Sequence, residues 1–325
     1  MALNPILPMS FTASSLLQDL VPATHTPFRN DGALDLGVVE RLAAHLLAQG
    51  ITAAFIGGTT GESHSLTLGE RQALARRWTD VARGTALRIV VHVGSNSLED
   101  ACELARQAQE LGATAISALA PSYFKPRTVA ELVAVCARIA GAAPATPFYY
   151  YDIPSYTGVS LPMPEFLVAA RERIPTLVGL KVSNPDLAAY QACLHAGGTA
   201  WDLPWGIDEA LLAALAVGGR GAVGSSYNFA APLYRRMLAA FASGDLAAAR
   251  AEQWRSVQLI RVLARFGYLG ASKAVMGMLG LEVGPARLPL TNPQPEQVTA
   301  LRSELEAIGF FGWIEPARPG AGNPL

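Results

Sequence analysis

Short apolar runs alternate along the chain with longer segments in which apolar residues recur every three or four positions. The short runs have the length of buried β-strands, and the longer segments have the period of amphipathic helices. The predicted strands are residues 20–23, 53–57, 88–93, 115–119, 147–151, 177–182, 201–205 and 221–223. The predicted helices that follow them are residues 35–49, 68–83, 98–111, 129–140, 164–171, 185–195, 208–216 and 231–242.

This alternation predicts an α/β fold with a parallel sheet. Eight strand–helix units of this length close most simply into a (β/α)8 barrel, the TIM barrel. The alternative is a doubly wound open sheet, which normally carries a G-x-G-x-x-G turn after its first strand. The turn after residues 20–23 reads THTP instead, which favours the barrel.

The barrel is predicted to occupy residues 17–242 and to be followed by a helical extension at residues 243–312. Three further helix-like segments indicate this extension, namely residues 246–264, 272–279 and 295–307. Residues 1–16 are interpreted as an N-terminal extension, because they lack the basic start of a signal peptide. Residues 313–325 are rich in proline and glycine, and we expect a disordered tail there.

Composition and charge narrow the function classes. The chain has 325 residues and a net charge of −1, which gives no support for a nucleic-acid partner or an anionic membrane. No apolar run reaches the ~18 residues that a membrane span needs, and the five histidines are too scattered to predict a metal site. Cys102, Cys136 and Cys193 form no CxxC pair, so we expect free thiols in a reducing compartment, the cytoplasm.

One lysine stands in an apolar strand. Lys181 lies in the predicted strand 177–182, and both faces of that strand are mostly apolar. Burying an ammonium is costly and favours the neutral amine, a nucleophile that forms Schiff bases with carbonyl groups. The alternative is a strand-end lysine that reaches solvent or pairs with a carboxylate. The other two lysines, Lys125 and Lys273, are interpreted as ordinary, one in a loop and one on a terminal helix.

Chemically distinctive side chains follow the ends of the predicted strands. In a (β/α)8 barrel the C-terminal strand ends meet at one rim, where active sites lie. We therefore expect one site that gathers these residues around Lys181. They are Thr59, Thr60 and Glu62 after the second strand, Tyr123 after the fourth, Tyr151 at the end of the fifth, Asp208 and Glu209 after the seventh, and Ser225 and Ser226 after the eighth.

Two of these motifs have both a functional and a structural interpretation. The GGTTGE turn at residues 57–62 suits a bound carboxylate or oxyanion. Alternatively, its glycines serve the turn and its threonines cap the next helix. A phenol at the rim, such as Tyr151, suits proton relay, whereas Tyr149 and Tyr150 suit aromatic filling of the core.

The last two motifs are open in the same way. Asp208 and Glu209 offer carboxylates to hydroxyl groups, or they favour the dipole of the helix that they begin. Ser225 lies in a small-residue turn that suits an anion or hydroxyl groups, or caps a helix.

Four motifs together carry a family resemblance. They are GTTGE at residues 58–62, YDIP at 151–154, GLKVS at 179–183 and GAVGSSYN at 221–228. From about residue 17 to residue 310, the chain resembles the class I aldolase superfamily of N-acetylneuraminate lyase and dihydrodipicolinate synthase. The segments most similar to the lyase branch are residues 147–151, 153–159, 206–209 and 284–290. The synthase branch has an arginine in the loop after its strand-five tyrosine, where this chain has Tyr156.

The resemblance implies a role for each residue of the predicted site. Lys181 would form the Schiff base, and Tyr151 would relay the proton during carbon–carbon cleavage. Thr59 and Thr60 would bind the pyruvate carboxylate and orient the tyrosine, and Tyr123 would reach into a neighbouring subunit's site. The residues implied to bind sugar hydroxyls are Ser183, Gly206, Asp208, Glu209 and Ser225.

The resemblance also implies a homotetramer that needs no metal or organic cofactor, because the lysine supplies the electron sink. Its small-molecule ligands would be pyruvate and a 2-keto sugar acid, N-acetylneuraminate (sialic acid), cleaved reversibly to N-acetylmannosamine and pyruvate.

One alternative is an aldolase or dehydratase for another 2-keto deoxy sugar acid. The other is a non-catalytic binding or sensor protein on the same barrel, against which the intact set of Lys181, Tyr151, Thr59 and Thr60 weighs.

Overall fold

The computed structural model describes residues 16–196 and 201–315. The predicted N-terminal extension, up to residue 15, and the predicted tail, from residue 316 onward, lie outside the described residues. The last described helix extends to Trp313, the first residue of the segment that we expected to be disordered.

The helices and strands agree closely with the predicted ones. The strands are β1 (Leu20–Pro22), β2 (Ala53–Ile56), β3 (Arg88–His92), β4 (Ala115–Leu119), β5 (Phe148–Asp152), β6 (Leu177–Val182) and β7 (Ala222–Gly224). The barrel helices are α1 (Val38–Ala48), α2 (Leu68–Ala82), α3 (Leu98–Glu110), α4 (Val129–Gly141), α5 (Pro154–Thr157), α6 (Met163–Ala170), α7 (Leu187–His195), α8 (Leu211–Ala216) and α9 (Tyr227–Ala242). The helices after the barrel are α10 (Leu246–Arg265), α11 (Tyr268–Met278), α12 (Pro295–Ala307) and α13 (Phe310–Trp313).

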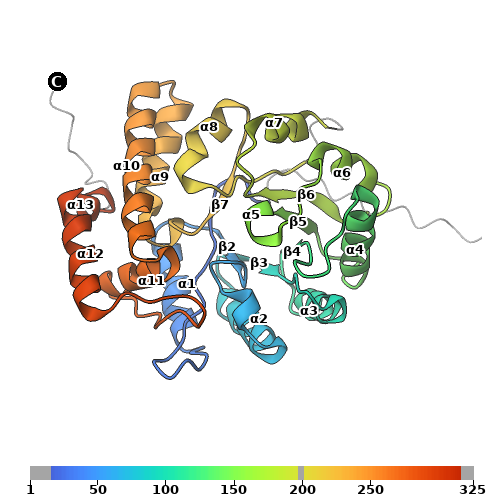
Figure 1. Ribbon diagram of the computed structural model, residues 1–325, viewed down its shortest axis with the longest axis horizontal. Helices are drawn as coiled ribbons and strands as arrows, with labels where there is room; N and C mark the ends of the chain where they lie inside the picture. The colour runs from blue at the N-terminus through green and yellow to red at the C-terminus, as the bar shows by residue number, and fades with distance from the viewer. Residues whose placement is uncertain (1–15, 197–200, 316–325) are drawn as a thin grey trace, which may run out of the picture.

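Parallel pairing follows the chain order around the barrel. One ladder joins β2, β3, β4, β5 and β6, and a second joins β1 to β7. A parallel bridge between Ala23 and Phe55 links β1 to β2, and residues 202–205 link β6 to β7. The strands therefore form a closed ring with the helices outside it, which is the predicted (β/α)8 barrel (Figure 1).

The predicted strand at residues 201–205 is not a regular strand. Asp202 and Trp205 form single parallel bridges to β6, and Trp205 forms another to β7. Pro204 lies between them and has no N–H to donate, so a continuous ladder cannot form here. Its carbonyl still accepts a hydrogen bond from the N–H of Val182, at 3.0 Å, and this helps to close the barrel.

Side chains of β5 alternate between the barrel interior and the helix layer. Tyr149 and Tyr151 belong to the apolar cluster inside the barrel. Tyr150 faces outward and packs on Phe166 of α6, with ring centroids 5.0 Å apart. The register of β5 and β6 pairs Tyr151 with Lys181, so these two residues are direct neighbours on adjacent strands.

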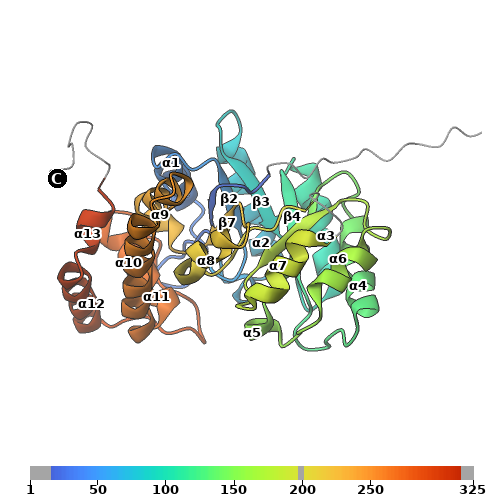
Figure 2. The same ribbon diagram turned by 90° about the horizontal axis from the view of Figure 1, so that it is seen from above.

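The C-terminal helices lie together on one side of the barrel, as Figures 1 and 2 show. α9 begins at Tyr227, before the predicted start, and a non-helical Ala230 just before Pro232 marks a kink in it. α11 begins at Tyr268, also earlier than predicted, after Gly267 at a φ of 77°. In the described part of the chain, no helix is both long enough and apolar enough to cross a membrane.

Candidate active site

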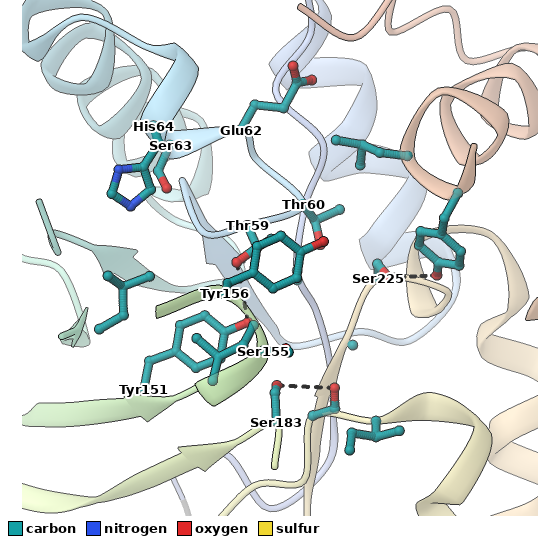
Figure 3. Close-up of a pocket in the computed structure, with 18 of the residues that line it drawn as sticks. Thr59, Thr60, Glu62, Ser63, His64, Tyr151, Ser155, Tyr156, Ser183 and Ser225 are labelled. Carbon is teal, nitrogen blue, oxygen red and sulfur yellow. Dashed lines mark hydrogen bonds between the residues drawn. The ribbon is translucent and has the colours of Figure 1, made fainter. Parts of the chain in front are cut away.

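A cavity of about 920 Å³ opens at the C-terminal ends of the strands. Loops after several strands line it, together with the start of α11 and residues 289–291 from the C-terminal extension. Figure 3 shows hydroxyl-bearing side chains pointing into it from several elements. The predicted site residues that line the cavity are Thr59, Thr60, Glu62, Tyr151, Lys181, Ser183, Gly206, Asp208, Glu209 and Ser225.

Lys181 is buried on β6 and surrounded by aromatic rings. Only 3% of the residue is exposed. Its Nζ lies 3.9 Å from the ring centroid of Tyr151 and 4.4 Å from that of Phe55. Lys181 forms no ion pair with the described residues, in contrast to Lys273. The structural interpretation of Lys181, a solvated or carboxylate-paired strand end, is therefore wrong.

The phenol of Tyr151 lies between Lys181 and the turn after β2. Its hydroxyl is 3.5 Å from Oγ1 of Thr59, which is long for a hydrogen bond between hydroxyls. Burial raises the pKa of Tyr151, but the charge of Lys181 and the contact with Thr59 outweigh burial, and the pKa falls below its ordinary value. A phenol with a lowered pKa exchanges its proton more readily near neutral pH.

The turn at residues 57–62 presents Thr59 and Thr60 to the cavity, where both are half-buried. A Cβ on Gly61 would lie 3.0 Å from the backbone of Gly57, so the turn packs tightly on itself. The threonines do not cap a helix, because α2 is capped by Thr67, whose side chain accepts from the N–H of Glu70. Their hydroxyls are thus available to a ligand, as the functional interpretation requires.

The two acidic residues after residues 201–205 have different surroundings. Asp208 is buried, and its carboxylate accepts hydrogen bonds from Oγ of Ser226 and, at 2.9 Å, from its N–H. Burial raises the pKa of Asp208 to about 6, although the bonds from Ser226 oppose this. Glu209 is exposed at the cavity. Asp208 therefore holds the turn after β7, and Glu209 is the freer carboxylate for a ligand.

Two hydroxyl contacts complete the far side of the cavity. Ser183 donates from Oγ to the carbonyl of Gly206, at 3.2 Å. A Cβ on Gly206 would lie 2.1 Å from that Oγ, so glycine is needed there. The hydroxyl of Ser225 is 2.7 Å from that of Tyr268 (Figure 3).

Comparison with known proteins identifies the family. Residues 16–308 match the family model described as the dihydrodipicolinate synthetase family. The chain belongs to this family. The N-acetylneuraminate lyase of Gallus gallus is 39% identical over 301 residues, which cover 91% of this chain and 98% of that protein.

Solved structures agree with this family assignment. The N-acetylneuraminate lyase (sialic acid aldolase) of Aliivibrio salmonicida is 41% identical, with a TM-score of 0.88, and the match covers 91% of this chain and 98% of that one. The DHDPS of Cyanidioschyzon merolae, solved with lysine bound, is 34% identical, with a TM-score of 0.82, over 90% of this chain and 98% of that one. This member of the dihydrodipicolinate synthetase family is thus more similar in sequence to these lyases than to that DHDPS.

Two of the predicted site residues do not line the cavity of this family member. Ser226 is fully buried and bonded to Asp208, and Tyr123 lies at the surface. Its ring is 78% exposed and packs edge-on against Phe124, itself 85% exposed, with centroids 4.9 Å apart. Oδ1 of Asn96 accepts hydrogen bonds from the N–H groups of Ser122 and Tyr123 and fixes this loop. The aromatic pair therefore lies at the surface and does not line the cavity of its own chain.

Sequence reasoning missed several residues of the site. Tyr268 reaches the cavity from α11, and Leu290 and Thr291 reach it from the loop before α12. No strand-end pattern marks them, because they come from elements outside the barrel. Lys273 on α11 was interpreted as ordinary, and this is wrong, since it is 3% exposed and paired with Glu62.

Asp152 lies outside the main cavity. It lines a second cavity of about 360 Å³ on the helix side of the barrel, where Nδ2 of Asn184 donates to its Oδ2 at 3.1 Å. Burial raises the pKa of Asp152 to about 6. In the described ranges, no group of three or more His, Cys, Asp or Glu side chains is placed to hold a metal ion.

Proposed function

We propose that this protein is a class I, pyruvate-dependent lyase that cleaves N-acetylneuraminate reversibly to N-acetylmannosamine and pyruvate. The observation that carries the proposal is the buried Lys181, which lies beside Tyr151 at the base of a cavity lined by hydroxyls. The lyase relatives of Gallus gallus and Aliivibrio salmonicida, each matched over 98% of its length, support the substrate. A cavity of about 920 Å³ is large enough for such an acyl sugar acid.

The reaction begins with the amine of Lys181. It adds to the C2 keto carbon, and loss of water gives a protonated imine. The hydroxyls of Thr59 and Thr60 bind the adjacent carboxylate. This places the keto carbon near Lys181, since Thr59 and Lys181 both lie next to Tyr151 in the cavity.

Tyr151 serves the cleavage step. It enters this step as a phenolate, because its proton left with the carbinolamine hydroxyl as water. The phenolate accepts the proton of the 4-hydroxyl while the C3–C4 bond breaks and the electron pair of that bond flows into the imine. The products are the aldehyde form of N-acetylmannosamine and an enamine on Lys181. The enamine takes a proton at C3, and hydrolysis of the imine releases pyruvate and the free lysine.

The remaining polar residues bind the sugar portion. Glu209 accepts hydrogen bonds from sugar hydroxyls, and Ser183 and Ser225 contribute their own hydroxyls. Asp208 acts indirectly. Its carboxylate binds Ser226 and so holds the turn that carries Ser225. The backbone at Gly206 allows close approach because it has no side chain.

The function is tested by measuring pyruvate release from N-acetylneuraminate and from 2-keto-3-deoxygluconate, with lactate dehydrogenase as the coupling enzyme. Release from N-acetylneuraminate, and its loss in Lys181→Met, is the expected result. Release from 2-keto-3-deoxygluconate alone would instead indicate an aldolase for another 2-keto deoxy sugar acid. Release from neither substrate by a folded protein would favour the non-catalytic binding protein.

We also propose a homotetramer in which Tyr123 reaches the site of a neighbouring subunit. The support is the exposed pair of Tyr123 and Phe124, whose rings lie beside the loop of Ser122, a residue that lines the cavity. Large exposed aromatic groups of this kind mark protein interfaces.

A reducing compartment, the cytoplasm, is the proposed location. Cys102, Cys136 and Cys193 are all free and buried. Burial raises the pKa of each of these thiols, which keeps them protonated and unreactive.

A further inference from the structure

A buried ion pair lies behind the turn that presents Thr59 and Thr60. Nζ of Lys273 is 2.6 Å from Oε1 of Glu62, and the two side chains are 1% and 0% exposed. The same Nζ donates to the carbonyls of Thr26 and Pro285, each at 2.9 Å. Removing one member of such a pair leaves the other charge buried and unpaired.

The pair ties the C-terminal extension to the barrel. Lys273 belongs to α11, whereas Glu62 ends the turn after β2. The other carboxylate oxygen of Glu62 accepts from the N–H of Arg287, at 2.8 Å. Arg287 in turn forms an ion pair with Glu70 in the first turn of α2. The carboxylate of Glu62 is thus held from two points of the extension.

The backbone of Glu62 needs this support. Among the described residues, Glu62 is the one residue other than glycine that has a positive φ, at 56°. The left-handed region is unfavourable for a residue with a Cβ, and such conformations persist where the surroundings enforce them. The N–H of Glu62 donates to the carbonyl of Thr59 at 3.0 Å, so the strained residue closes the turn directly onto Thr59.

A second contact holds the turn from the other side. Oγ1 of Thr26 donates to the carbonyl of Gly61 at 2.6 Å, while the carbonyl of Thr26 accepts from Lys273. Lys273 therefore holds Gly61 and Glu62 in two ways. It pairs directly with the carboxylate of Glu62, and it bonds to Thr26, which in turn bonds to Gly61. A shift of Lys273 would move the turn as a unit.

Neither charged group is placed for chemistry. Lys273 does not line the cavity, although Lys181 does. Glu62 contributes to the cavity wall, but Figure 3 shows its carboxylate pointing away from Thr59 and Thr60. The functional effect of the pair must therefore act through the position of the two threonines.

We propose that Glu62 and Lys273 are positioning residues, which hold the Thr59–Thr60 turn in the geometry that binds the carboxylate of the keto acid. The C-terminal helix α11 is then part of the active-site architecture. This inference rests on the proposed function, because it presupposes that Lys181 forms an imine with a keto acid whose carboxylate meets the turn.

The test compares two ketones that form an imine with the same lysine. Pyruvate carries the carboxylate, and hydroxyacetone does not. Trapping on Lys181 with borohydride is measured against ketone concentration in the full chain, in Lys273→Met and in Glu62→Gln. The half-saturating pyruvate concentration should rise about tenfold or more in both variants, since small displacements of a binding group have effects of this size. The hydroxyacetone curve should stay within about twofold of the parent.

A matched control comes from the same extension. Glu252 is also buried and paired, with Arg236 at 2.9 Å and Arg255 at 2.7 Å, but it does not line the cavity. Glu252→Gln should leave both ketone curves unchanged. Lys273→Arg keeps the cation and is the second variant if Lys273→Met does not fold; its pyruvate curve should lie between those of the parent and Glu62→Gln.

The outcomes separate the two proposals. An unchanged pyruvate curve in folded Glu62→Gln would overturn the positioning role, and so would an equal loss with both ketones, which indicates general damage to the fold. Absence of any trapping in the parent chain would instead contradict the proposed function itself.

Discussion

Two of the three lysines are buried within the described chain, and their surroundings separate their roles. Nζ of Lys273 faces a carboxylate at 2.6 Å, which opposes the lowering of the Lys273 pKa by burial. Nζ of Lys181 faces the rings of Phe55 and Tyr151, which stabilise a cation much less than a close carboxylate does. Lys181 is therefore free of an ion pair among the described residues and lies beside the phenol of Tyr151, as the proposed nucleophile requires.

At the residue scale, Tyr151→Phe removes the proton relay and leaves the lysine in place. We expect the rate of cleavage to fall by about 10²–10⁴-fold, the usual contribution of a general acid–base group. The measurement is pyruvate release at saturating N-acetylneuraminate, with borohydride trapping of pyruvate to confirm that the imine still forms.

Tyr150→Phe is the matched control for this change. The hydroxyl of Tyr150 is buried in the helix layer and has no hydrogen-bond partner among the described residues. The control should keep the rate within about twofold of the parent, because it removes no group from the cavity. Equal rates in Tyr151→Phe and Tyr150→Phe would remove Tyr151 from the mechanism.

Asp152 gives a prediction for the pH dependence of stability. Burial raises its pKa from 3.8 to about 6 in the folded chain. Between these values the folded state binds more protons than the unfolded state, so the free energy of unfolding falls as pH rises from about 4 to about 6. Ionisation of this residue lowers the free energy of unfolding by about 2–3 kcal/mol over this pH range.

Asp152→Asn should therefore flatten the fall in the free energy of unfolding between pH 4 and 6, as measured by urea unfolding. Burial also raises the pKa of Asp202 and of Asp208, so part of the fall should remain. The lowered pKa of Glu70, beside Arg287, acts in the opposite direction in the parent and the variant alike. The exposed Glu172 supplies the control, and Glu172→Gln should keep the parent slope. A slope that is the same in Asp152→Asn and the parent would contradict the assignment.

At the scale of the elements, the period of the apolar residues is enough to predict most helices and strands, and the strand ends predict most of the cavity. Residues 201–205 were expected to form a strand, but Pro204 limits them to single bridges. Tyr268 and Lys273 were not foreseen as parts of the site, because their neighbours, Ser225 and Glu62, are distant in sequence. Only the packing of α11 brings them together.

Closure of the barrel between β6 and residues 202–205 leaves no room for a side chain at Gly179. A Cβ there would lie 1.7 Å from the carbonyl oxygen of Asp202, a backbone atom that cannot rotate away. We expect Gly179→Ala to lower the free energy of unfolding by about 3 kcal/mol or more. The measurement is urea unfolding followed by circular dichroism.

Gly69→Ala provides the comparison at this scale. Gly69 lies in α2, and a Cβ there meets no atom within 4 Å. This change should be neutral or stabilising by up to about 1 kcal/mol, since alanine favours the helix. If Gly179→Ala were as stable as Gly69→Ala, the close approach of the two backbones would be contradicted.

At the scale of the whole molecule, the barrel and the extension build one site together. Ser225 after β7 contacts Tyr268 of α11, and Glu62 after β2 contacts Lys273 of the same helix. Tyr123 and Phe124 point the other way, to the surface. The molecule thus completes part of its site from its own C-terminal helices, and it exposes the two aromatic rings at which we propose contact with a second copy.

Size-exclusion chromatography with light scattering tests the proposed assembly. We expect a mass four times that of the 34.2 kDa chain. Tyr123→Ser combined with Phe124→Ser should shift the distribution toward smaller species, because it removes two exposed rings from the proposed interface. A parent chain that elutes as a monomer would contradict the role of Tyr123 in a neighbouring site.

The most direct measurement is borohydride reduction with pyruvate, and separately with N-acetylneuraminate, followed by mass spectrometry of the peptide that contains Lys181. We predict a reduced adduct on Lys181 with both ligands and none in Lys181→Met. An adduct on another lysine, or on no lysine at all, would contradict the Schiff-base mechanism on which the proposed function depends.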